Sequence, residues 1–72
     1  MGKDINIKFG ETVAKLRRQK GLSQEELAFR CGIHRTYIGA VERGEKSPTL
    51  NTIKKIAVGL EVEVIELFVY GS

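Results

Sequence analysis

Hydrophobic residues recur every three or four positions along much of the chain, and this spacing predicts helices rather than strands. The first helix is predicted over about residues 8–20, where Val13 and Leu16 share one face among basic residues. Gly21 follows a basic last turn, and a glycine at that position is a common helix end.

Two shorter helices are predicted in the middle of the chain. The second starts after Ser23, because Ser23 and Glu26 have the spacing of a capping box, and it ends at Gly32. The third is predicted over about residues 34–43 and is closed by Gly44. The residues expected to face inward are Leu27, Ala28, Cys31, Ile33, Ile38 and Val41.

The last third of the chain predicts one clear helix and one ambiguous element. After a surface loop at residues 45–48, Thr49 and Thr52 open a fourth helix. The segment from about Glu63 to Phe68 is predicted as a short fifth helix, although its β-branched residues fit a strand equally well. The fourth helix carries an apolar stripe of Leu50, Ile53, Ile56, Ala57 and Leu60.

The composition limits what the chain can be. A length of 72 residues suits one domain, so residues 1–72 are expected to form a single unit. One Cys and one His exclude an internal disulfide and an internal structural zinc site, and no cofactor is expected. No apolar run is long enough to span a membrane and the N-terminus lacks the apolar core of a signal peptide, so a cytoplasmic protein is expected.

Charge and size together indicate partners. The first 48 residues carry ten Lys and Arg against six Asp and Glu, whereas the remaining residues have a net charge of −1. This asymmetry suits a nucleic-acid binder that pairs through its other side, although the overall charge of +3 alone fits ordinary solubility. A domain below roughly 70–80 residues often needs a further source of stability, and without a disulfide or metal we expect a homodimer.

The second and third helices have the arrangement of a helix-turn-helix, over about residues 23–43. Ala28 is small where the two helices would cross, and Gly32 can enter a left-handed turn without a Cβ clash. Each placement is weak alone, but their combination in one short window strongly favours this motif.

The segment LSQEELAFRCGIHRTYIGAVERGEKSPTLNTIKKIAVGL resembles the lambda-repressor-like (XRE-type) helix-turn-helix DNA-binding domain, and the resemblance covers about residues 9–68. Within it, HRTYIGAVERGEKSPTLNTIKKIA and the short chain are most similar to the controller proteins of bacterial restriction–modification systems. The resemblance implies an all-α, compact five-helix bundle. It also implies a symmetric homodimer that binds double-stranded DNA at palindromic operators. Such a protein activates its own operon at low dose, with RNA polymerase as a further partner, and represses it at high dose.

Arg35 and Thr36 are the residues expected to contact DNA bases, because the N-terminal end of the second motif helix enters the major groove. An arginine can bind guanine O6 and N7 with two hydrogen bonds, and a threonine methyl can meet the thymine methyl. The alternative for both residues is a solvated surface position or a phosphate contact.

The flanking polar residues are expected to contact the sugar–phosphate backbone. Gln24 starts the second helix, where the helix dipole and free N–H groups favour a phosphate. His34 is expected to form a hydrogen bond either locally or to phosphate, and Tyr37 either reaches the backbone or covers the edge of the core. The full set is Gln24, His34, Tyr37, Arg43, Lys46 and Ser47.

The resemblance carries two structural expectations. It implies that Arg17 and Glu42 form a partly buried ion pair between the first helix and the end of the third. The family usually has Gly after the fourth helix and Ser or Asp before the fifth, but this chain has Glu61 and Glu63. Glu61 must therefore adopt a backbone conformation that usually belongs to glycine.

The C-terminal segment, about residues 61–70, is expected to form the dimer interface, because it holds more apolar side chains than one small core can bury. Val64, Leu67 and part of Phe68 are assigned to the core, and Ile65 with the outer edge of Phe68 to the partner. The predicted interface set is Ile65, Phe68 and Val64.

Other functions are weighed against this interpretation. No catalytic set can be assembled from one His and one Cys, so an enzyme is not expected. The remaining alternatives are a stand-alone phage-type repressor and an antitoxin or adaptor that uses the same fold to bind proteins. The tip formed by Arg35, Thr36 and Tyr37, with its flanking basic loop, argues against a pure adaptor.

Overall fold

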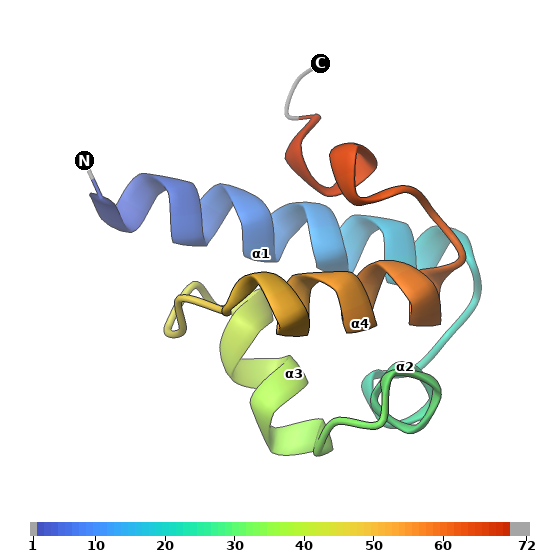
Figure 1. Cartoon of the computed structure of the whole chain (residues 1–72). Helices are drawn as coiled ribbons and strands as arrows, with labels where there is room; N and C mark the ends of the chain where they lie inside the picture. Colours follow the sequence, from blue (N-terminus) through green and yellow to red (C-terminus); the bar gives the residue numbers. More distant parts are fainter. Residues whose placement is uncertain (1, 70–72) are drawn as a thin grey trace.

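The structure is a computed structural model that describes residues 2–69. In chain order the elements are α1 (Gly2–Gln19), α2 (Gln24–Cys31), α3 (Arg35–Glu42), α4 (Leu50–Leu60) and the 3-10 helix η1 (Val64–Phe68). Figure 1 shows α2 and α3 on one side of α1 and η1 on the other. The expected all-α fold is confirmed, but its fifth element is a short 3-10 helix and not an α-helix.

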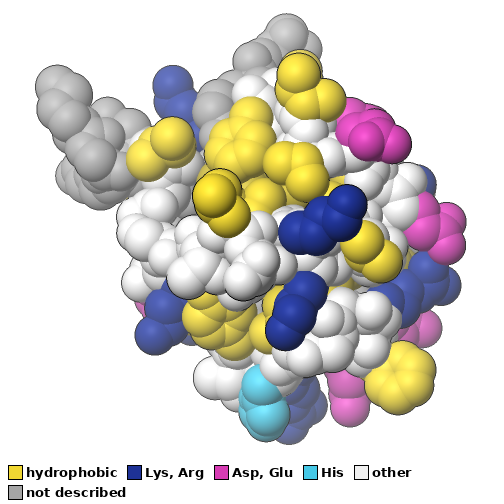
Figure 2. Space-filling view, in the orientation of Figure 1, with side chains coloured by type: hydrophobic (Ala, Val, Ile, Leu, Met, Phe, Trp, Pro, Cys, Tyr) yellow, Lys and Arg dark blue, Asp and Glu magenta, His cyan; other side chains and the backbone are white. Residues whose placement is uncertain are grey.

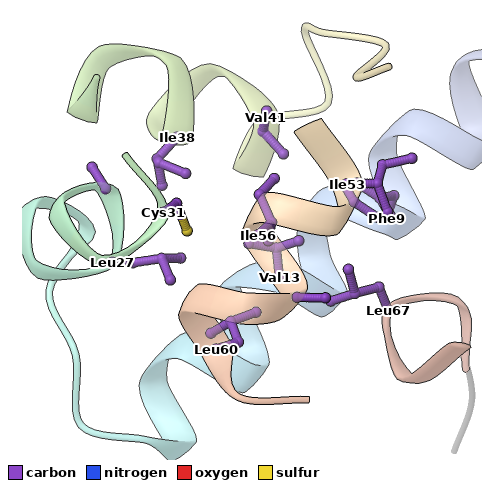
Figure 3. Close-up of a cluster of buried hydrophobic side chains, with 12 residues drawn as sticks. Phe9, Val13, Leu27, Cys31, Ile38, Val41, Ile53, Ile56, Leu60 and Leu67 are labelled. Carbon is purple, nitrogen blue, oxygen red and sulfur yellow. The ribbon is translucent and has the colours of Figure 1, made fainter. Parts of the chain in front are cut away.

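One hydrophobic core joins all five elements (Figure 3). Packing contacts connect α1 with α3, α2 with both α3 and α4, and η1 with both α1 and α4. The residues expected to face inward from α2 and α3 all contribute, although Ile33 lies at the edge of the core. The buried cluster consists of Phe9, Val13, Leu27, Ala28, Cys31, Ile38, Val41, Ile53, Ile56, Ala57, Leu60 and Leu67.

The predicted start of α1 near residue 8 is wrong, because the helix already begins at Gly2. The hydrophobic pattern missed these first turns because they do not continue the buried face, and both Ile5 and Ile7 are exposed. Ile7 instead packs against the loop that follows α3. The contact with Gly44 is so close that a Cβ added to this glycine would lie only 2.7 Å from Ile7 Cγ1.

Side-chain caps fix where α2 and α4 begin. The Ser23 hydroxyl accepts a hydrogen bond from the Glu26 N–H at 2.9 Å, and the Ser23 N–H donates to Glu26 Oε1 at 2.7 Å. These hydrogen bonds hold the pKa of the Glu26 carboxyl below its usual range. Thr49 caps α4 by accepting from the Thr52 N–H at 3.2 Å. The predicted starts of both helices are confirmed.

The two ends of α4 depart from the simple pattern. Leu50 is 84% exposed, so its predicted place in the buried stripe is wrong. Leu50 is the first residue of α4 and precedes the part of the helix that packs on the core. That part begins at Ile53, the first buried residue of α4. At the other end Glu61 adopts the left-handed conformation expected for it, with a φ of 61°. This conformation costs a residue other than glycine about 1–2 kcal/mol.

The C-terminal element differs from the predicted α-helix and from the alternative strand. Proteins use 3-10 helices in short pieces, and five residues suit that tighter winding. Leu67 is buried as predicted, whereas Val64 is exposed at the rim, so its assignment to the core is wrong. Phe68 is partly covered by Phe9, with 5.3 Å between the ring centres. Tyr70, at the end of the expected interface segment, lies outside the described residues.

Candidate nucleic-acid interface

The helix-turn-helix presents the N-terminal end of α3 to solvent. The turn starts at Gly32, whose φ of 69° is the left-handed conformation expected there. Ile38 and Val41 are fully covered by the core and hold α3 in place (Figure 3). On the outer side of the first turn, Arg35 and Thr36 are both exposed. The two residues expected to contact bases therefore lie together at an accessible helix end.

The guanidinium of Arg35 extends into solvent, and its side chain is 66% exposed. A carboxylate oxygen of Glu25, on α2, lies 4.0 Å from Arg35 Nη1. An exposed ion pair of this kind contributes little to stability, so Glu25 holds the Arg35 guanidinium only weakly. Sequence reasoning missed Glu25 as a neighbour because the contact depends on the angle between α2 and α3.

His34 and Tyr37 already serve the fold. His34 Nδ1 accepts a hydrogen bond from the Thr36 N–H at 3.1 Å and thereby caps α3, which is the local one of the two roles expected for it. Tyr37 is half-buried and packs against the edge of the core. A contact of either residue with DNA stays a prediction.

The carboxylate of Glu42, on α3, connects this helix with α1 and α2. Arg17 Nε donates to Glu42 Oε2 at 2.7 Å and Arg17 Nη2 to Oε1 at 3.1 Å, so the structure brings the two residues of the expected ion pair together. Gln24 Nε2 also donates to Glu42 Oε1, at 2.9 Å. The Arg17 and Glu42 side chains are only 11% and 6% exposed. The hydrogen bond to Glu42 raises the pKa of Arg17 although burial acts in the opposite direction.

Arg43, expected to contact phosphate, has an intramolecular partner that the sequence analysis did not predict. Arg43 Nε donates to Glu45 Oε2 at 2.9 Å and Arg43 Nη2 to Glu45 Oε1 at 3.1 Å. This pairing raises the pKa of Arg43 and holds the pKa of Glu45 below its usual range. Both side chains are exposed, so a phosphate that binds Arg43 has to compete with the Glu45 carboxylate.

The loop between α3 and α4, residues 44–49, presents Lys46 and Ser47 to solvent. Gly44 turns the chain at the end of α3 with a φ of 78°. Asn6, in the second turn of α1, donates from Nδ2 to Ser47 Oγ at 2.8 Å. Asn6 was missed because the first helix was expected to begin after it.

The N-terminal end of α3 and the exposed hydrophobic side chains near the C-terminus lie at opposite ends of the molecule. Figure 2 shows the histidine beside basic side chains at the end formed by α2 and α3, and hydrophobic side chains over the end formed by α4 and η1. The residues expected to contact DNA and those expected to contact a second copy therefore lie on different faces. The exposed hydrophobic residues near the C-terminus are Val64, Ile65, Phe68 and Val69.

The remaining reactive groups offer no second chemistry. Cys31 is buried in the core, and burial raises its pKa to about 11, so the thiol stays protonated at neutral pH. Among the side chains that the structure describes, no three of His, Cys, Asp or Glu are arranged to hold a metal ion. No helix in this part of the chain combines the length and apolar character needed to cross a membrane.

Comparison with known proteins identifies relatives that share this geometry. The family described as helix-turn-helix matches residues 13–67. Control protein C.BamHI of Bacillus amyloliquefaciens is 43% identical over 68 residues, which cover 93% of this chain and 84% of that protein. The restriction–modification controller protein C.AhdI from Aeromonas hydrophila superposes with a TM-score of 0.86 at 49% identity, over 88% of this chain and 96% of that one. The controller protein C.Esp1396I, solved as a tetramer with its natural 35 base-pair operator, gives a TM-score of 0.83 at 34% identity, over 89% of this chain and 84% of that one.

A helix-turn-helix whose second helix has an exposed basic tip defines the class of DNA-binding transcription regulators. Within that class, the chain belongs to the helix-turn-helix family and to its restriction–modification controller proteins. Members of this family regulate transcription and are not enzymes.

Proposed function

We propose that this chain binds a palindromic operator as a homodimer and controls transcription of a restriction–modification operon. The observation that carries the proposal is the exposed Arg35–Thr36 end of α3, which the buried residues Ile38 and Val41 hold against the core. The relatives named as control proteins support the assignment to such an operon, and the operator complex of C.Esp1396I supports the DNA partner.

In the proposed complex, α3 enters the major groove with its N-terminal end first. Arg35 donates two hydrogen bonds to a guanine edge, and Thr36 places its methyl against a thymine methyl. The weak pairing of Arg35 with Glu25 leaves its guanidinium available for this contact.

Residues around α3 hold the sugar–phosphate backbone on both sides of the groove. The first turn of α2 offers N–H groups and a helix dipole that favour a phosphate, and the loop at residues 44–49 offers exposed basic and hydroxyl groups. Gln24 and Arg43 exchange hydrogen bonds with Glu42 and Glu45 for hydrogen bonds with phosphate. The proposed backbone set is Gln24, His34, Tyr37, Arg43, Lys46 and Ser47.

The dimer forms through the exposed face of η1, with Ile65, Phe68 and Val64 against the partner. A contiguous hydrophobic face of this kind is unusual on a monomer that stays in water. A two-fold dimer would place the two copies of α3 about 34–36 Å apart, which is one turn of DNA.

This function also supplies the cellular setting. A transcription regulator acts where its operon is transcribed, so we place residues 1–72 in the cytoplasm as one DNA-binding domain. Activation at low dose requires contact with RNA polymerase, whereas repression at high dose requires an occupied operator.

The test is a gel-shift titration with two duplexes of equal length and base composition. One duplex carries the region upstream of the chain's own gene, and the other carries the same bases in scrambled order. We expect selective binding of the first, and equal weak binding of both or none would favour a protein-binding adaptor. Genes for a methyltransferase and an endonuclease beside the regulator gene would support the controller, and their absence would favour a stand-alone repressor.

A further inference from the structure

Asn6 and Ile7, near the start of α1, contact the loop at residues 44–49. Ile7 packs against Gly44 at the start of this loop, and Asn6 Nδ2 donates to Ser47 Oγ in its middle, at 2.8 Å. Figure 1 shows the loop folded back beneath the N-terminal half of α1. The part of α1 that the hydrophobic pattern did not predict therefore supports a segment expected to contact DNA.

The middle of this loop has little support of its own. Among the described residues, positions 46–48 make no backbone–backbone hydrogen bond. The N–H groups of Lys46 and Ser47 are therefore free to donate to phosphate oxygens, and Pro48 favours an extended conformation at Ser47. The hydrogen bond described for this stretch comes from Asn6.

The helix that carries Asn6 is fixed to the end of α3. A Cβ on Gly10 would overlap the carbonyl oxygen of Val41 and would lie 2.8 Å from that of Glu42, so the backbones of α1 and α3 touch. The partly buried ion pair of Arg17 with Glu42 joins the same two helices two turns further along. A hydrogen bond from α1 to the loop therefore fixes the loop relative to α3.

We propose that Asn6 is a positioning residue for DNA binding, which holds Ser47 and the neighbouring N–H groups in the conformation that meets the DNA backbone. This inference rests on the proposed function. A loop without this hydrogen bond would populate its binding conformation for only part of the time. The apparent affinity then equals the intrinsic affinity multiplied by that fraction. Asn6 acts through Ser47 and makes no contact with DNA itself.

The first test compares Asn6→Ala with Gln19→Ala, which removes an exposed amide from the other end of the same helix. Asn6→Ala should weaken binding of both the upstream and the scrambled duplex by roughly two- to tenfold per half-site. The slope of log affinity against log salt should also fall, by about one unit for each phosphate that the loop no longer binds. In the free protein, amide hydrogen exchange should accelerate at residues 44–49 while α2 and α4 keep their protection. Gln19→Ala should change none of these quantities.

A double-mutant cycle separates positioning from direct contact. In a Ser47→Ala background, Asn6→Ala should cost no further affinity, because the partner through which it acts is gone. Equal losses in both backgrounds would give Asn6 a DNA contact of its own and would overturn the positioning role. Unchanged affinity and loop exchange in Asn6→Ala, with normal binding by the unsubstituted chain, would overturn this inference alone. Binding of neither duplex by the unsubstituted chain would overturn the proposed function, and the positioning role with it.

Discussion

At the scale of single residues, Arg35 carries the proposed specificity. Its side chain is 66% exposed and has only a weak pairing with Glu25, so little has to be given up when it binds a base. Arg35→Ala should cost about 1–3 kcal/mol on the upstream duplex and much less on the scrambled one, as expected for a guanine bound by two hydrogen bonds. Fluorescence anisotropy titrations of the two duplexes at one salt concentration measure the difference.

The matched control for this prediction is Arg30→Ala. Arg30 is also an exposed arginine of the motif, but it lies on α2 and pairs with Glu61 at 3.8 Å. We expect it to leave the ratio of the two affinities unchanged. Equal losses for Arg35→Ala on both duplexes would assign Arg35 to the phosphate backbone.

The native Glu45 side chain is expected to oppose DNA binding. Its carboxylate accepts hydrogen bonds from Arg43 and places a negative charge at the proposed interface. Its pKa is held below the usual range by the hydrogen bonds from Arg43, so it is fully ionised at neutral pH. Glu45→Gln should therefore tighten binding of both duplexes and steepen the salt dependence by about one unit as Arg43 becomes free for a phosphate. Glu11→Gln, which neutralises an exposed carboxylate on α1, should not change the slope. Weaker binding by Glu45→Gln would show that Glu45 positions Arg43 for DNA.

Contacts between side chains of different elements are the part of the site that the sequence predicts least well. The pairing of Arg17 with Glu42 was expected only because the family resemblance implied it. The hydrogen bonds of Gln24 with Glu42 and of Asn6 with Ser47 were not expected. Periodicity tells which face of a helix is buried but not the angle at which two helices cross, and that angle decides which polar side chains meet.

At the scale of elements, α1 and α3 approach each other closely where they cross at Gly10. Alanine in place of glycine inside a helix usually stabilises it, by about 0.5–1 kcal/mol. At Gly10 the added Cβ would overlap backbone atoms of Val41 and Glu42, which cannot rotate away as a side chain can. Gly10→Ala should therefore lower the free energy of unfolding by about 1–3 kcal/mol, measured by urea denaturation.

The control for the crossing is Lys15→Ala, at an exposed position of the same helix. That change should stay within about 0.5 kcal/mol of the unsubstituted chain. A Gly10→Ala variant as stable as the unsubstituted chain would mean that α1 can shift on α3 without cost. The loop at residues 44–49 would then have a less rigid support than the structure indicates.

The elements predicted best are those whose ends depend on neighbouring residues. The caps at the starts of α2 and α4 join residues that are three positions apart, and α2 ends at a glycine in the left-handed conformation. The local sequence was therefore sufficient to predict where these helices begin and where α2 ends. The start of α1 depends on a loop about 40 positions away in the sequence, to which Asn6 and Ile7 are joined. η1 packs against α1 and α4 and buries Leu67 in the core. Its 3-10 conformation depends on this packing, which the β-branched residues of the segment do not predict.

At the scale of the whole molecule, the proposed DNA-binding surface and the exposed hydrophobic face of η1 depend on each other. A single copy presents one α3 and can neutralise only a few phosphates, and affinity at physiological salt falls steeply as that number decreases. Two copies joined at η1 would bind two half-sites with the same rigid geometry. The hydrophobic face over α4 and η1 (Figure 2) is therefore as necessary to the proposed function as the residues proposed to bind DNA.

Ile65 is the residue that tests this dependence. Ile65 is 71% exposed, although isoleucine is usually buried, and it lies three residues before Phe68 in η1. Ile65→Glu should place a charge in the interface while it leaves the core residue Leu67 untouched. We expect a folded monomer by analytical ultracentrifugation and circular dichroism, with a collapse of affinity for the upstream duplex although no proposed DNA contact is altered.

Phe29→Ser is the control for oligomeric state, because Phe29 is 88% exposed on α2, outside the face of η1. It removes a larger exposed hydrophobic side chain than Ile65→Glu does, so a non-specific effect of hydrophobic surface would appear in both variants. We expect Phe29→Ser to remain a dimer with unchanged affinity. If Ile65→Glu is still a dimer at micromolar concentration, the two copies meet elsewhere. The spacing of about 34–36 Å between their recognition helices would then have to come from a different pair of faces.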